Sequence, residues 1–142
     1  MSMQGVIFND KHSFRDWGLL ISSRPNISPP IPKLKLIDVP GSDGALDLTE
    51  SLTGKVHYEM RTIRFEFIVM DERGRWPSRY SEILNYLHGK RVRIIMDDDP
   101  NFYYTGRVTV GDLDPEKKTA TLEMEAKVEP YKQERFGTRR CL

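Results

Sequence analysis

Residues 76–111 carry the sequence WPSRYSEILNYLHGKRVRIIMDDDPNFYYTGRVTVG, which predicts a helix followed by two antiparallel strands. Apolar side chains recur at i, i+4, i+7, i+8 and i+11, which is the spacing of one face of an α-helix. These residues are Trp76, Tyr80, Ile83, Leu84 and Leu87. Pro77 suits the first turn of this helix, and Gly89 suits the left-handed position just after its end.

The two strands are indicated by alternation on either side of an acidic turn. Residues 91–96 and 103–110 each place their apolar side chains on one face, and the sequence Asp-Asp-Asp-Pro-Asn at 97–101 interrupts the pattern. The helix is apolar on one side only, so we expect it to pack against the sheet that these strands form.

Other segments extend the same sheet. Residues 58–70 and 119–128 alternate apolar and charged side chains, and residues 33–39 could form a shorter strand. Residues 6–8 and the residues around Phe14 flank a polar turn and predict two short strands. With about six strands, one good helix and no βαβ alternation, we expect a mainly β, largely antiparallel fold with the helix packed on one side.

A long loop or protruding hairpin is expected at residues 39–54. The Pro-Gly-Ser-Asp-Gly sequence at 40–44 marks a turn with at least one residue at positive φ, and the residues after it have weak periodicity. This segment contains Leu46, Leu48 and Leu52, which would be costly to leave in water. The leucines could fold back onto their own sheet.

The composition excludes several classes of protein. The chain has 142 residues, enough for one domain, and its 22 Lys and Arg nearly balance 21 Asp and Glu. No global field therefore draws it to DNA or to an anionic membrane. Cys141 is the only cysteine, which excludes a disulfide-built secreted module. No stretch is long enough to span a bilayer and no secretory signal is visible, so we expect synthesis in a cytoplasm.

The polar residues give no positive argument for an enzyme, a cofactor or a catalytic site. His12, His57 and His88 lack metal-ligating spacing, and no nucleophile or phosphate-binding motif occurs. His88 follows the helix, where a positive charge is favoured, so a structural role is expected.

Two local groups of residues could still bind a ligand. Asp97, Asp98 and Asp99 could hold a hard cation, but adjacent residues of an extended segment point in alternating directions, so a solvated turn is favoured. Tyr103 and Tyr104 beside Arg107 could stack on a base or a sugar ring, although aromatic residues that pack within a strand are more common.

Three segments in combination resemble the N-terminal region of the distal tail (Dit) proteins of long-tailed bacteriophages. They are PGSDGALDLTESLTG at 40–54, RYSEILNYLHGKRVRIIMDDDPNFYYTGR at 79–107, and a final amphipathic strand that runs into EPY at 129–131. In the second segment, the motif residues of the turn and the strand are Asp97, Asp98, Asp99, Pro100, Tyr103, Tyr104, Gly106 and Arg107.

The resemblance implies a division of the chain into a ring-forming domain at residues 1–131 and a basic, flexible tail at 132–142. The domain would be a β-sandwich or split barrel with one helix, similar to tail-tube subunits. In the family it forms a hexameric ring at the tail tip that joins the tail tube to the baseplate hub around the channel through which DNA leaves, without specific binding. Leu46, Leu48 and Leu52 would then be covered by a neighbouring subunit.

This resemblance implies a structural component of a phage or prophage virion, assembled in the host cytoplasm, with no membrane partner and no enzymatic activity. Two other classes remain open. Another ring of the tail machinery, such as the tube protein, shares the broad fold, but the motif at 97–107 favours the distal ring. A carbohydrate-binding module would need Trp76, Tyr103 and Tyr104 to form an exposed platform.

Overall fold

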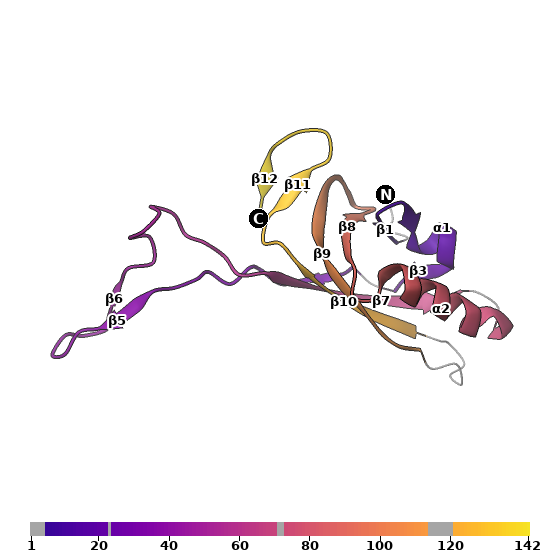
Figure 1. Ribbon diagram of the computed structural model, residues 1–142, viewed down its shortest axis with the longest axis horizontal. Helices are drawn as coiled ribbons and strands as arrows, with labels where there is room; N and C mark the ends of the chain where they lie inside the picture. The colour runs from indigo at the N-terminus through magenta and orange to yellow at the C-terminus, as the bar shows by residue number, and fades with distance from the viewer. Residues whose placement is uncertain (1–4, 23, 71–72, 114–120) are drawn as a thin grey trace.

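The computed structural model describes residues 5–22, 24–70, 73–113 and 121–142 (Figure 1). Twelve strands are formed by these residues: β1 (Val6–Phe8), β2 (Lys11–His12), β3 (Leu19–Ile21), β4 (Asn26–Ile27), β5 (Leu36–Asp38), β6 (Ala45–Asp47), β7 (Arg61–Val69), β8 (Arg91–Met96), β9 (Asp99–Leu113), β10 (Thr121–Val128), β11 (Lys132–Glu134) and β12 (Arg140–Cys141). The helical elements in the same residues are α1 (Ser13–Trp17), the 3₁₀ turn η1 (Arg73–Arg75) and α2 (Trp76–Leu87).

One antiparallel sheet of ten strands dominates the structure. Its main path runs β2-β1-β8-β9-β10-β7-β3, with β4 beside β7 and the β11–β12 hairpin beside β9. The sheet is a half-barrel, and α1 and α2 lie together at one end of the molecule in Figure 1. This confirms the fold class predicted from the sequence, with more strands than the expected six.

The α2 helix lies where the sequence predicted it. Trp76, Ile83 and Leu87 are buried on its inner face, and Gly89 adopts a φ of 75° just after the helix. The Tyr80 hydroxyl donates a hydrogen bond of 2.8 Å to the Gly111 carbonyl of β9. The amphipathic face therefore fixes both the position and the orientation of the helix on the sheet.

The core lies between the helices and one face of the four longest strands. As predicted, the alternating apolar side chains of β7, β8, β9 and β10 point to this face. An aromatic cluster joins the N-terminal segment to the sheet: Phe8 stacks on Trp17 with ring centroids 6.1 Å apart and meets the edge of Phe65 of β7 at 5.8 Å. These aromatic side chains bury large apolar areas, so the cluster stabilises the N-terminal strand on the sheet.

Three expectations about local structure were wrong. The residues around Phe14 form α1, not a strand, because the His12 side chain caps the backbone N–H groups at the start of that helix. The acidic turn contains only residues 97 and 98, since β9 begins at Asp99 and continues for 15 residues. Residues 132–142, expected to be an unpatterned tail, form β11 and β12, and β11 pairs with β9. The boundary expected between residues 131 and 132 stays a prediction. Ala120 and most of the turn expected at 113–118 lie outside the described residues.

Candidate subunit interface

A narrow two-stranded arm, residues 28–60, reaches away from the sheet on the side opposite to the helices (Figure 1). The outgoing and returning segments of the arm are joined by backbone hydrogen bonds. They include Glu59 N–H to Ile31 O at 2.8 Å and Lys33 N–H to His57 O at 2.7 Å. Near the tip, β5 and β6 pair in register. The protruding hairpin expected at 39–54 is therefore the outer part of a longer arm.

The arm carries a concentration of exposed apolar side chains. Leu52 is 94% exposed and Leu46 is 50% exposed, while Leu48 is half-buried. The same arm exposes further large hydrophobic residues that the sequence analysis did not single out: Ile31, Leu34, Leu36, Ile37, Val39 and Met60. Covering one such side chain contributes about 2 kcal/mol. The sheet of the same chain does not cover them, so the arm is the surface best suited to a partner.

The base of the arm is fixed by a buried arginine. Arg61 is 9% exposed and donates hydrogen bonds to the carbonyl of Ser28 at 3.1 Å and to that of Pro130 at 3.2 Å. Its guanidinium also lies over the Tyr104 ring, 5.7 Å from the centroid. Arg61 thus joins the first residue of the arm to the end of β10 and to the core.

The three aspartates at 97–99 each contact a cationic or imidazole group from a different part of the chain. Asp98 pairs with Arg24 at 3.2 Å, and Asp99 pairs with Lys132 of β11 at 2.7 Å. Asp97 pairs with His12 instead. Because the carboxylates point to different partners, they do not converge. Among the described residues, no group of three or more His, Cys, Asp or Glu could hold a metal ion.

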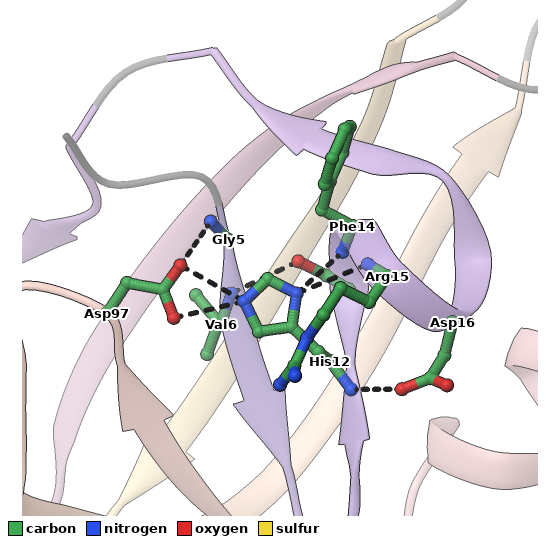
Figure 2. A network of polar contacts seen from close by, with 8 residues as sticks. Gly5, Val6, His12, Phe14, Arg15, Asp16 and Asp97 are labelled. Carbon is green, nitrogen blue, oxygen red and sulfur yellow. Dashed lines mark hydrogen bonds and ion pairs between the residues drawn. The ribbon is translucent and has the colours of Figure 1, made fainter.

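His12 connects the N-terminal segment to the acidic turn (Figure 2). Its imidazole is buried, and Nδ1 accepts hydrogen bonds from the backbone N–H groups of Phe14 at 3.1 Å and Arg15 at 3.3 Å. Nε2 lies 3.0 Å from both carboxylate oxygens of Asp97. Because Nδ1 accepts, the ring carries its proton on Nε2 and donates it to Asp97. The network is structural, and the sequence analysis did not detect it.

The other two histidines make local contacts. His88 Nδ1 accepts a hydrogen bond of 3.1 Å from the backbone N–H of Val110, which links the end of α2 to β9. His57 Nε2 lies 2.7 Å from the Thr53 hydroxyl on the arm. The three imidazoles are therefore used in separate places.

The aromatic residues considered for ligand stacking do not form an exposed platform. Trp76 and Tyr104 are each only 6% exposed. Tyr103 is half-buried, and its hydroxyl donates a hydrogen bond of 2.8 Å to the Gln133 side chain. The guanidinium of Arg93 lies over the Tyr103 ring. Trp76, Tyr103 and Tyr104 therefore do not present exposed ring faces on which a sugar ring or a base could stack.

The remaining motif residues support the strand β9. Gly106 is opposite both Val92 and Val128, and a Cβ at this position would lie 2.0 Å from the Lys127 carbonyl oxygen. Only glycine allows this close approach of backbones. Arg107 is exposed and donates to the Gly89 carbonyl at 3.1 Å, and the Pro100 carbonyl accepts from Arg135 at 3.0 Å.

Two groups have shifted pKa values. The hydroxyl and backbone N–H of Thr49 hold the pKa of Asp47 below 3.8, so this carboxylate of the arm stays ionised at neutral pH. Partial burial of its hydroxyl, followed by the charge of Asp112, raises the pKa of Tyr80 above 10.0. Neither group has the partners of a catalytic acid or base.

No protein-family model matches this chain, and no curated protein matches its sequence. The fold matches the crystal structure of the Dit protein of phage SPP1, with a TM-score of 0.68 and 17% sequence identity. The match covers 94% of this chain and 53% of that protein, so the chain spans about half the length of the SPP1 protein. That protein is described as a paradigm of the hub adsorption apparatus in phages that infect Gram-positive bacteria.

The likeness establishes the fold: this chain has the fold of the part of the SPP1 Dit protein that it matches, as the sequence resemblance implied. None of the helices formed by the described part of the chain is long and apolar enough to cross a membrane.

Proposed function

We propose that this chain is a structural component of the tail tip of a long-tailed phage or prophage. Copies of it form a ring, six in number, that joins the tail tube above to the baseplate hub below. DNA passes through the centre of the ring without being specifically bound. The chain acts in the virion after synthesis and assembly in the host cytoplasm, and it has no catalytic role.

The observation that carries this proposal is the arm with its uncovered apolar side chains on a Dit-like domain. A closed ring is built from heterologous contacts, in which one patch meets a different patch on the next subunit. An arm that leaves its own domain is suited to such a contact, because its apolar residues can be covered only by another molecule. Leu46, Leu48 and Leu52 are assigned to this interface.

The alternatives receive less support from the described residues. The carbohydrate-binding module required an aromatic platform, and Trp76 and Tyr104 are buried. The polar residues considered for metal binding are engaged in separate structural contacts. A ring elsewhere in the tail machinery would use the same fold, and the motif at 97–107 favours the distal position.

The proposal is tested by changing arm leucines and measuring mass by size-exclusion chromatography with light scattering. Leu52→Asp changes a side chain that is 94% exposed, so the monomer keeps its stability while the ring dissociates. Leu48→Asp shifts the mass in the same direction. Met70→Asp, at an exposed methionine outside the arm, is the matched control and keeps the ring. If both leucine variants fold and keep the oligomeric mass of the wild type, the interface assignment is wrong.

A further inference from the structure

The tip of the arm, residues 36–50, is strongly acidic as well as apolar. It contains four acidic residues and no lysine, arginine or histidine: Asp38, Asp43, Asp47 and Glu50. All four are exposed, and they alternate with the exposed apolar residues Leu36, Ile37, Val39 and Leu46. A partner surface for the tip must therefore offer positive charge beside apolar groups.

The outer face of the sheet offers a matching basic row. Arg91, Arg107 and Lys127 lie opposite one another on β8, β9 and β10, and all three are exposed. Like charges directly opposite in a sheet destabilise it. Arg91 pairs with Glu129 at 3.1 Å, whereas no ion pair within the described residues involves Arg107 or Lys127. This row therefore has charge available for a partner.

The C-terminal hairpin extends the basic surface. Residues 132–142 contain four basic residues and one acidic residue, and Arg140 lies over the Tyr131 ring at 4.9 Å from its centroid. A groove of about 1030 Å³ runs between this hairpin, the sheet and the base of the arm. Basic residues outnumber acidic ones in its lining: Lys33, Arg91, Lys127 and Arg140 against Glu59 and Glu129, beside the apolar and aromatic Leu52, Tyr58 and Tyr131. We call it the basic groove.

Of the tip residues, Thr49 lines the basic groove of its own chain, whereas β5 and β6, which carry Asp38 and Asp47, lie further out on the arm, which points away from β8, β9 and the hairpin (Figure 1). We propose that the acidic arm tip of one copy docks in the basic groove of the next copy around the ring. This inference rests on the proposed function and adds the identity of the receiving surface.

The proposed contact is heterologous, since tip and groove are different surfaces, and it can repeat around a closed ring. It covers the exposed leucines of the tip, and it also places each docked tip against the arm of its neighbour, where Leu52 and Tyr58 line the groove. Because the pairing is partly electrostatic, raising the salt concentration weakens association.

A charge-swap experiment tests the inference with the full chain. The arm variant carries Asp38→Lys, Asp43→Lys and Asp47→Lys, and the groove variant carries Arg91→Glu, Lys127→Glu and Arg140→Glu. A matched control for the arm variant, Asp10→Lys with Glu66→Lys and Glu123→Lys, makes the same change in net charge at exposed residues away from the arm. Sedimentation velocity measures assembly, and circular dichroism confirms that each variant folds.

We expect each swapped variant alone to associate at least tenfold more weakly than the wild type, since tip and groove then have the same sign. Mixed in equal amounts, the two variants reassemble, because each tip meets a groove of opposite charge. The control assembles as the wild type does. If the wild type, the arm variant alone and the groove variant alone form rings equally well, the docking inference is wrong, while the proposed ring is supported. If neither the wild type nor the mixture associates, both the inference and the ring are wrong.

Discussion

Gly106 provides the sharpest test of how the central strands are packed. In the structure the backbone of β10 passes directly over this residue, and an added Cβ would lie 2.0 Å from the Lys127 carbonyl oxygen and 2.5 Å from the Val128 Cα. Both obstacles are backbone atoms of a strand held on its other side by β7, so they cannot rotate away. Gly106→Ala must therefore push β9 and β10 apart.

The loss of stability expected for Gly106→Ala follows from this geometry. Overpacking costs about 1–3 kcal/mol when side chains can adjust. Here a backbone ladder must move, so we expect a loss of about 3 kcal/mol in the free energy of unfolding. For a chain of this length the melting temperature falls by about 10 °C. Urea denaturation followed by far-ultraviolet circular dichroism measures the first quantity, and a thermal scan measures the second.

Two other glycines make the test internally controlled. A Cβ at Gly111 would lie 2.8 Å from the Glu123 carbonyl oxygen, so Gly111→Ala is expected to have a smaller effect than Gly106→Ala. A Cβ at Gly74 meets no atom within 4 Å, so Gly74→Ala changes stability by less than about 0.5 kcal/mol. If Gly106→Ala is as stable as Gly74→Ala, the close approach of β9 and β10 described here is wrong.

Three further outcomes follow from single contacts. His12→Ala lowers the free energy of unfolding by about 2 kcal/mol, since it removes a helix cap and the partner of Asp97. In the wild type, nitrogen-15 NMR finds the imidazole proton of His12 on Nε2. A proton on Nδ1 would contradict the capping geometry. Tyr80→Phe costs about 1 kcal/mol at pH 8 because the bond to Gly111 is lost. The raised pKa of Tyr80 stabilises the wild type fully below pH 10.0 and is lost as the pH rises above that value, so denaturation at increasing pH must show this difference shrinking; a constant difference refutes the assignment. Arg61→Met leaves two backbone carbonyls without a donor and costs about 2 kcal/mol in urea denaturation, and an unchanged midpoint would show that the arm base is not fixed by this residue.

The parts of the fold that could be predicted are the elements whose apolar residues recur with a regular local period. The α2 helix shows a 3.6-residue pattern over its whole length, and β7 and β10 alternate because one face is buried and the other is exposed. Such elements are specified by their own residues. The Dit-like fold followed from combining them with the motif at 97–107.

The parts that could not be predicted depend on contacts between distant residues. The α1 helix has only five residues and a histidine as its cap, which is not among the usual capping residues, so no local signal marked it. The pairing of β11 with β9 joins residues about thirty positions apart, such as Gln133 and Tyr103. The exposure of Ile37 and Val39 on the arm depends on where the rest of the chain lies.

The central claim is that copies of this chain close into a ring through their arms. Negative-stain electron microscopy of the purified chain, with its mass fixed by light scattering across a wide range of concentrations, tests this claim directly. The account predicts ring-shaped particles with six-fold class averages and a mass near six times 16.5 kDa. A single species of 16.5 kDa at every concentration, with no rings on the grid, would contradict it.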